Sequence, residues 1–318
     1  MRIVASVTIS IYALAAHGPS YAQQYPEKPI RIIVGFGQGG PTDVVARVLA
    51  DQLSQKLTQR VYVENRPGAS GNIATQALAS GDADGYTYMV GASPFAINHS
   101  LFPDFPVKFE TDVAAVRSIG ATTNALVVNP RLKIAGLSEF IRFAKAGGPE
   151  SVSYITLGQG SSSHLAGVEF DRLAGTKMLP VPYRGSGEAL QDVVAGQVMA
   201  WFAPISSVGE LVKAGKLNAL GVTGPRRVAE LPDVPTLDEA GLKGFDVRLW
   251  VGLFARTGIP KERLEVFERA LSSATQTKTY ISTLSMQGIE PMEMTRSEFG
   301  SFVRSEIARW KVVVGNLR

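Results

Sequence analysis

The sequence Ile30-Arg-Ile-Ile-Val34 runs without interruption into Gly35-Phe-Gly-Gln-Gly-Gly-Pro-Thr-Asp43. The apolar run predicts a strand over residues 30–36, and apolar residues at helical spacing predict a helix over 43–58. Glycine lets the backbone approach a bound group closely, and the helix directs its positive end at the same turn. We therefore expect this turn to bind an anion.

The glycine turn also fits the pattern of a dinucleotide-binding site. Gly35, Gly37 and Gly40 match G-x-G-x-x-G between a strand and a helix. Glu64 closes the next apparent strand, over residues 61–64, where an acid would contact a ribose. An exported α/β enzyme that uses this turn for a nucleotide is therefore one hypothesis.

The N-terminus carries the features of an export signal. Arg2 precedes an apolar run over residues 3–16, and Ser20-Tyr-Ala22 places small residues at the two positions that a signal peptidase inspects. The run is shorter than the roughly 20 residues of a membrane span, which favours cleavage over an uncleaved anchor. We expect cleavage after Ala22 and a periplasmic mature chain. Export removes the chain from the NAD pool and so weakens the nucleotide hypothesis.

The composition excludes several classes of function. The chain has no cysteine, which excludes disulfides, thiolate metal sites and cysteine nucleophiles. After the export signal the histidines are His99 and His164, too few for a metal site of several imidazoles. The net charge of +4 comes from Lys and Arg scattered among acids, so we expect no nucleic-acid partner. Neither a metal nor a cofactor is expected.

Strand-like runs alternate with helical periodicity along the chain, which is typical of an α/β fold with mainly parallel sheets. A new series begins with the strand expected over 125–130, and the chain length favours two domains. Two α/β lobes with several ligand-facing turns predict a cleft between them. The expected divisions are a signal peptide over 1–22, a first lobe over 23–125, a second lobe over 126–226 and a return to the first lobe over 227–318. The other expected elements are helix 73–78, strand 87–90, helix 137–146, strand 152–156, helix 164–170, strand 179–183, helix 187–195, strands 198–202, 217–222 and 249–254, and helices 260–276 and 296–314.

Two further turns resemble the first in their chemistry. Arg66-Pro-Gly-Ala-Ser-Gly-Asn72 opens one helix, and Gly158-Gln-Gly-Ser-Ser-Ser163 opens another, just before His164. Serine hydroxyls and free N–H groups at a helix start form a good cradle for a carboxylate. A simple N-cap needs one serine, so three in a row favour binding.

Three polar side chains leave alternative interpretations open. Asp43 either contacts a ligand or, as the favoured interpretation, stabilises the helix dipole; Thr42 or Asp43 can cap the helix. His164 is expected to be structural, because it and Ser162 point to different faces of a helix and no G-x-S-x-G sequence marks a hydrolase. Arg184 either clamps a carboxylate or points away from it.

Several short sequences occur together in an order that is far more specific than one glycine pattern. They are Tyr25-Pro26 with Lys28-Pro29-Ile30, Phe36 to Asp43 with Arg47, Val63-Glu-Asn-Arg-Pro-Gly68 with Gly71-Asn72, Ser161 to Gly167, Val181-Pro-Tyr-Arg-Gly185, Gly196-Gln-Val198, Ala214-Gly-Lys-Leu217, and Leu231-Pro-Asp-Val-Pro-Thr236 with Glu239-Ala-Gly241. With these sequences the chain resembles the periplasmic substrate-binding proteins of tripartite tricarboxylate transporters, the Bug family, over nearly its whole mature length.

The resemblance implies a two-lobed periplasmic binding protein of the Venus-flytrap kind, type II-like, with a ligand cleft between the lobes and no enzymatic activity. It implies a monomeric receptor that delivers a small organic carboxylate to membrane permease subunits, one large and one small. By analogy, the ligand-binding residues of the first lobe are Phe36, Gly39, Gly40, Asp43, Pro67, Gly68, Ala69, Ser70, Gly71 and Ser93. Those of the second lobe are Ser161, Ser162, Ser163, His164, Tyr183, Arg184, Gly185, Ser186, Phe202, Ala203 and Pro204.

Departures from the family pattern bear on the ligand. Many members carry aspartate where this chain has Met199, and some carry another at Ala203. A ligand with an amino group would lose a partner here, so an aliphatic or aromatic carboxylate is favoured. A ligand-sensing subunit of a signalling system would share the same fold and stays an alternative.

Overall fold

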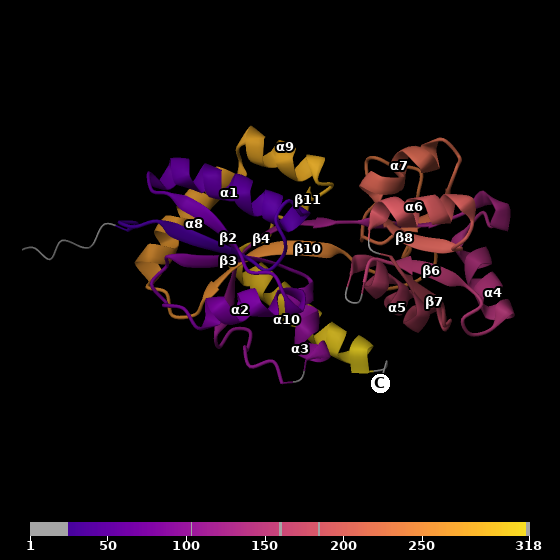
Figure 1. Cartoon of the computed structure of the whole chain (residues 1–318), viewed down its shortest axis with the longest axis horizontal. Helices are drawn as coiled ribbons and strands as arrows, with labels where there is room; N and C mark the ends of the chain where they lie inside the picture. Colours follow the sequence, from indigo (N-terminus) through magenta and orange to yellow (C-terminus); the bar gives the residue numbers. More distant parts are fainter. Residues whose placement is uncertain (1–24, 103, 159–160, 184, 316–318) are drawn as a thin grey trace, which may run out of the picture.

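Figure 1 shows the computed structural model of the chain, with two α/β lobes side by side. The structure describes residues 25–102, 104–158, 161–183 and 185–315. The predicted signal peptide and Arg184 lie outside the described residues. Among the helices that are described, none is long and apolar enough to cross a membrane.

The first lobe is built on a sheet with the strand order β11-β4-β10-β3-β1-β2. β1 pairs in parallel with β2 and β3, whereas β10 pairs antiparallel with β3 and β4. The strands are β1 (Ile30–Val34), β2 (Val61–Asn65), β3 (Thr87–Ala92), β4 (Val113–Thr122), β10 (Leu249–Arg256) and β11 (Glu290–Pro291). The helices are α1 (Pro41–Leu57), α2 (Asn72–Ala79), α3 (Pro94–Leu101), α8 (Lys261–Thr275), α9 (Lys278–Met286) and α10 (Arg296–Gly315), with a 3₁₀ turn η1 (Ala69–Gly71).

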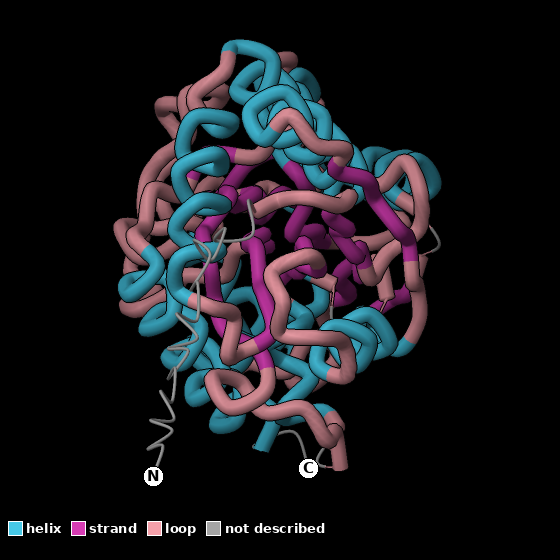
Figure 2. Tube along the Cα trace, turned by 90° about the vertical axis from the view of Figure 1, so that its left-hand side faces the viewer, coloured by secondary structure: helices cyan, strands magenta, loops and turns pink. Residues whose placement is uncertain are grey.

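Helices cover both faces of this sheet, which explains why β1 is almost continuously apolar. Ile32 and Val34 pack into the core beneath α1, α8 and α9, and Ile33 packs into the core with α2, α3 and α10. Figure 1 shows these two groups of helices on opposite sides of the strands. In the orthogonal view of Figure 2 the strands lie inside the molecule, between helices.

The second lobe repeats this design on a sheet with the order β7-β6-β8-β5-β9. β6 pairs in parallel with β7 and β8, and β5 pairs antiparallel with β8 and β9. The strands are β5 (Asn124–Val128), β6 (Ser153–Thr156), β7 (Leu179–Pro182), β8 (Ala200–Pro204) and β9 (Asn218–Val222). The helices are α4 (Leu137–Gly147), α5 (Ser162–Ala174), α6 (Ser186–Ala195) and α7 (Ile205–Lys213), with a 3₁₀ turn η2 (Pro130–Leu132).

The expectation of mainly parallel sheets is wrong, because both sheets are mixed. The chain leaves the first lobe along β4 and enters the second along β5, and it returns along β9 and β10. These crossing strands run antiparallel to their neighbours in each sheet. Strands of the first sheet lie before residue 123 or after residue 248, whereas Val228 and Leu231 pack into the core of the second lobe. The division of the lobes at residues 125 and 226 stays a prediction.

The two crossing segments are joined to each other where they pass between the lobes. Thr223 N donates to the Asn124 carbonyl at 2.8 Å, and Asn124 N donates to Thr223 Oγ1 at 3.0 Å. A Cβ on Gly224 would lie 2.7 Å from Thr123 Oγ1, so any larger residue there would displace the Thr123 side chain. The crossing is therefore a compact, hydrogen-bonded pair of strands.

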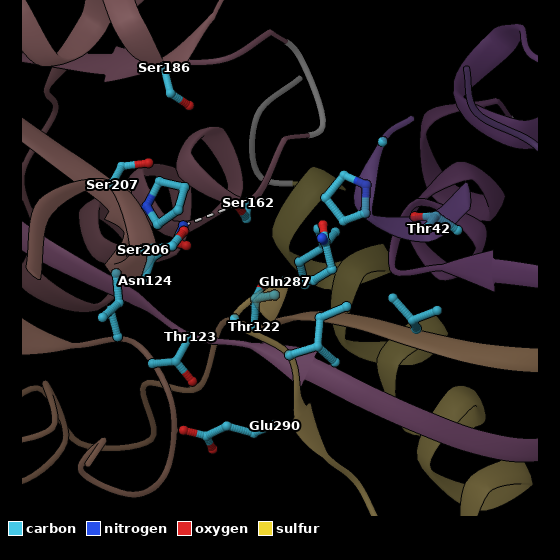
Figure 3. A pocket seen from close by; sticks show the side chains of 18 of the residues that line it. Thr42, Thr122, Thr123, Asn124, Ser162, Ser186, Ser206, Ser207, Gln287 and Glu290 are labelled. Atoms are coloured by element: carbon cyan, nitrogen blue, oxygen red, sulfur yellow. Dashed lines mark hydrogen bonds between the residues drawn. The ribbon is translucent and has the colours of Figure 1, made fainter. Parts of the chain in front are cut away.

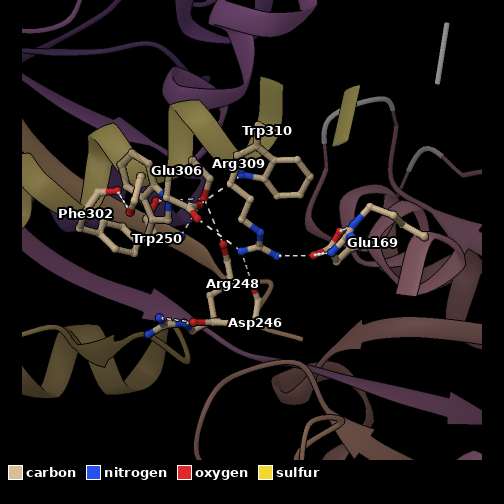
Figure 4. A network of polar contacts seen from close by, with 11 residues as sticks. Glu169, Asp246, Arg248, Trp250, Phe302, Glu306, Arg309 and Trp310 are labelled. Carbon is tan, nitrogen blue, oxygen red and sulfur yellow. Dashed lines mark hydrogen bonds and ion pairs between the residues drawn. The ribbon is translucent and has the colours of Figure 1, made fainter. Parts of the chain in front are cut away.

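A polar network also joins the lobes away from the crossing (Figure 4). Arg309 Nη2 on α10 lies 3.1 Å from Glu169 Oε1 on α5. Glu306 Oε2 accepts from Trp250 Nε1 at 3.1 Å and from Trp310 Nε1 at 3.2 Å, which anchors α10 to β10. Movement of one lobe against the other must therefore act on this ion pair.

Candidate functional site

A cavity of about 1200 Å³ lies between the lobes. Figure 3 shows it from close by, with Thr42 contributed by the first lobe and Ser162 and Ser207 by the second. The crossing segment from Thr122 to Asn124 lies between them. The cavity is therefore bounded by both lobes and by a segment that connects them.

Helices from both lobes begin at this cavity. Pro41 of α1, Ser162 of α5, Ser186 of α6 and Ile205 of α7 are the first residues of their helices, and each lines the cavity. The first N–H groups of a helix have no intrahelical acceptor and carry the positive end of its dipole. The backbone itself therefore favours an anion in the cavity.

Charged side chains add no net attraction for an anion. Among the described lining residues Lys213 is the one cationic side chain, and its Nζ lies 2.9 Å from Glu210 Oε1. Glu230 and Glu290 also line the cavity. An anion would therefore be bound by N–H groups and by hydroxyls. The cavity hydroxyls belong to Thr42, Ser70, Thr122, Thr123, Ser161, Ser162, Ser186, Ser206, Ser207 and Ser285.

Apolar side chains form the rest of the lining. Phe36 lies in the glycine turn, Leu249 and Val251 lie on β10, and Ile281 and Met286 lie on α9. Met286 is 74% exposed and Ile281 is 48% exposed, unusually high values for large apolar residues. A ligand with an apolar part would bury this surface.

The structure brings together one group of the predicted site residues. Phe36, Gly40, Ser70, Ser161, Ser162, Ser186 and Pro204 line the cavity. The turn that carries Ser70 is held in an unusual conformation, because Ala69 (φ 46°) and Ser70 (φ 54°) both lie in the left-handed region. Asn98 Nδ2 donates to the Ser70 carbonyl at 3.0 Å and holds this turn. Such strained backbone is concentrated at functional sites.

Asp43 is buried beside the cavity and braces the glycine turn. Its carboxylate accepts from Gly39 N at 2.9 Å, from Arg47 Nε at 2.9 Å and from Asn65 Nδ2 at 2.7 Å. Burial raises the pKa of Asp43, but these hydrogen bonds outweigh it and hold the pKa below its usual value. The helix begins earlier than predicted, with Gly40 as N-cap, so neither Thr42 nor Asp43 caps it.

The three serines at the start of α5 make different contacts. Ser161 Oγ accepts from His164 N at 3.3 Å and is the N-cap, and the buried Ser163 Oγ accepts from Leu157 N at 3.1 Å. Ser162 remains to present its hydroxyl to the cavity. Burial lowers the pKa of His164, which does not itself line the cavity.

The other predicted residues do not line the cavity either. Ser93 is buried, and its Oγ accepts from Trp250 N at 2.8 Å, which joins β3 to β10. Burial and the hydrogen bond to Asp192 raise the pKa of Tyr183 to about 12. Phe202 and Ala203 are fully buried in the core of the second lobe. Gly39, Pro67, Gly68, Ala69, Gly71 and Gly185 do not line the cavity, although Gly40, Ser70 and Ser186 beside them do.

Several lining residues were missed by the sequence analysis. Thr122 to Asn124 form the crossing segment, Ser206 and Ser207 lie in the first turn of α7, Gln287 directly follows α9, and Glu290 begins β11. The polar triplet Thr-Thr-Asn between two apolar runs was a usable signal for the crossing. No comparable signal marks residues 287–290.

The ribose-binding role considered for Glu64 is not compatible with its surroundings. Its carboxylate forms ion pairs with Arg31, at 3.0 Å, and with Arg66. Burial raises the pKa of Glu64, but these arginines outweigh it and hold the pKa below its usual value. Among the described residues, no group of three or more His, Cys, Asp or Glu side chains is placed to hold a metal ion.

Known proteins match the chain over most of its length. Residues 45–318 match the family model of the tripartite tricarboxylate transporter family receptor. Protein BugT of Bordetella pertussis is 36% identical over 98% of this chain and 96% of its own. A Rhodopseudomonas palustris protein solved with adipate is 30% identical, with a TM-score of 0.73 over 92% of this chain and 97% of its own. MatC of the same species, solved with malate, is also 30% identical, with a TM-score of 0.72 over 91% of this chain and 100% of its own.

Proposed function

The chain belongs to the tripartite tricarboxylate transporter receptor family, and from this premise we propose that it captures a small organic carboxylate between its lobes. The bound species is an aliphatic di- or tricarboxylate or an aromatic carboxylate. The receptor acts as a monomer in the periplasm after cleavage behind Ala22. It delivers the carboxylate to a membrane permease of one large and one small subunit.

The convergence of four helix N-termini on the cavity is the observation that carries this proposal. α1 comes from the first lobe, and α5, α6 and α7 come from the second. A carboxylate held by these N–H groups is stabilised by both lobes at once, so binding favours the closed arrangement. The adipate and malate complexes of the two Rhodopseudomonas proteins support the same class of ligand.

Calorimetric titration tests the proposal directly. Malate, adipate, citrate and benzoate are titrated into the mature protein, and the primary amide of each acid serves as an uncharged control. We expect at least one acid to bind with a micromolar Kd and its amide to bind at least about tenfold more weakly, because hydrogen bonds to charged groups are the stronger ones. Absence of binding by all four acids, or equal binding of acid and amide, would contradict the proposal.

Delivery to the permease is tested in cells. Uptake of the acid that binds is measured in strains that lack the receptor or the two permease subunits. We expect both deletions to abolish the receptor-dependent part of uptake. Uptake that needs the receptor but not the permease would assign the receptor another partner, such as a sensor.

A further inference from the structure

Asn124 occupies the point where the chain crosses from the first lobe to the second. Asn124 is 2% exposed, although asparagine is usually a surface residue. Its backbone N–H donates to Thr223 Oγ1, and its carbonyl accepts from Thr223 N, directly after β9. The side chain is therefore held in one position, and its buried amide needs hydrogen-bond partners.

The surroundings determine which way the amide points. The Phe202 carbonyl lies 3.1 Å from Asn124 Nδ2, and a carbonyl can only accept a hydrogen bond. Nδ2 must therefore face β8, with its second hydrogen directed at Ser162 Oγ at 3.0 Å (Figure 3). Because this hydrogen bond comes from the amide, Ser162 Oγ acts as its acceptor.

This direction leaves the Ser162 hydroxyl proton available. Ser162 lies at the start of α5 and lines the cavity, and no described residue accepts its proton in the structure. Ser161 and Ser163 differ, because their oxygens receive backbone N–H groups and lie 3.1 Å from each other. Of the three serines, Ser162 is the one set up to donate into the cavity.

We propose that Asn124 is a positioning residue that makes Ser162 a hydrogen-bond donor to the ligand's carboxylate. The inference rests on the proposed function, since it needs an anion in the cavity. Both partners of the Asn124 amide, Phe202 and Ser162, belong to the second lobe. The donor is therefore preorganised before the lobes close, which lowers the entropic cost of binding.

A double-mutant cycle tests this arrangement. The Kd is measured for the wild type, S162A, N124D and S162A/N124D, with the tightest binder among malate, adipate, citrate and benzoate. S162A should weaken binding by about 10- to 100-fold, because a hydrogen bond to a charged group is lost. S162T retains the hydroxyl and should bind within about threefold of the wild type.

N124D places an acceptor where the amide donates, so the Ser162 proton turns towards it and away from the cavity. In the S162A background only the repulsion by the new charge remains. The affinity loss caused by N124D should therefore be at least about tenfold smaller in S162A than in the wild type. S207A is the matched control, since this cavity hydroxyl has no described contact with Asn124, and its effect should multiply with that of N124D.

Equal effects of N124D in both backgrounds, or wild-type affinity in S162A, would overturn the inference while leaving the proposed function intact. If N124D does not fold, N124L replaces it in the cycle, as an uncharged side chain of similar size. N124L should then weaken binding in the presence of Ser162 and not in S162A, and any other pattern overturns the inference. A wild type that binds none of the four acids overturns both proposals.

Discussion

Arg309 and Glu169 face each other across the two lobes, with Arg309 Nη2 3.1 Å from Glu169 Oε1 (Figure 4). Glu169 is 1% exposed and also receives Arg172 Nε at 2.7 Å. A buried carboxylate needs such partners, because removal from water is costly for a charge. The C-terminal helix of the first lobe thus supplies part of the environment of an acid in the second.

Replacing Arg309 by glutamine should lower the free energy of unfolding by about 1.5–3 kcal/mol, because a charged hydrogen bond to a buried acid is lost. R304Q is the matched control on the same helix, since the Arg304–Glu110 pair is about half exposed and such pairs contribute about 0–1 kcal/mol. Urea denaturation at neutral pH measures both. Equal losses of unfolding free energy in the two variants would show that the Arg309–Glu169 pair stabilises the fold no more than an exposed pair does.

Asp43 should make stability depend on pH in the acid range. Its pKa is lower in the folded chain than in the unfolded one, so it stabilises the fold above the unfolded pKa of about 4. This stabilisation is lost as the pH falls through the lower, folded pKa. D43N should therefore cost about 2 kcal/mol at pH 7 and progressively less below about pH 4.

Denaturant titrations of D43N and the wild type at several pH values measure that difference. D51N, which removes an exposed acid from the same helix, is the control and should change stability little at any pH. A D43N deficit that stays constant down to pH 2 would mean that packing, not charge, sets its effect.

His164 should make the folded chain less stable in acid, because protonation of its buried ring is unfavourable. Burial lowers its pKa, so the unfolded chain binds a proton more readily than the folded one. Stability should fall as the pH drops below about 6.5, the unfolded value, and level off below the lower folded pKa. H164N should flatten this part of the profile, which thermal unfolding between pH 5 and 8 measures. A wild-type profile that H164N leaves unchanged would rule out this titration.

Gly120 permits the contact between β4 and β11. A Cβ at this position would lie 2.5 Å from the backbone oxygen of Glu290, which cannot move without shifting β11. G120A should cost about 1–3 kcal/mol of stability and also weaken carboxylate binding, because Glu290 and Pro291 line the cavity.

G300A is the control for that substitution. Gly300 lies within α10 with open space around its Cβ position, so alanine should stabilise by up to about 1 kcal/mol through its helix propensity. Thermal unfolding and titration with the bound acid measure both variants. A G120A protein as stable as the wild type would show that β11 can shift at little cost in free energy.

Local patterns predicted the elements that are apolar and regularly spaced. The first unit was expected as strand 30–36 and helix 43–58 and is found as Ile30–Val34 and Pro41–Leu57. β4 was missed, because Arg117, Ser118 and Gly120 interrupt its apolar run. Its strand structure comes from pairing with β10 and β11, residues more than a hundred positions away. α3, α7 and α9 were missed as well.

Sequence alone determined the glycine turns, the serine-rich helix starts and the family, because these depend on residues that are neighbours in the chain. Tertiary structure decided which of them share one cavity. Asp43 lies in the glycine turn yet is turned inward by Arg47 and Asn65. Asn124 carries no local signal of a site, and its role arises because β5 brings it next to Phe202 and Ser162. Hydrogen bonds between residues distant in sequence form only when strands pair, so no window of the sequence contains them.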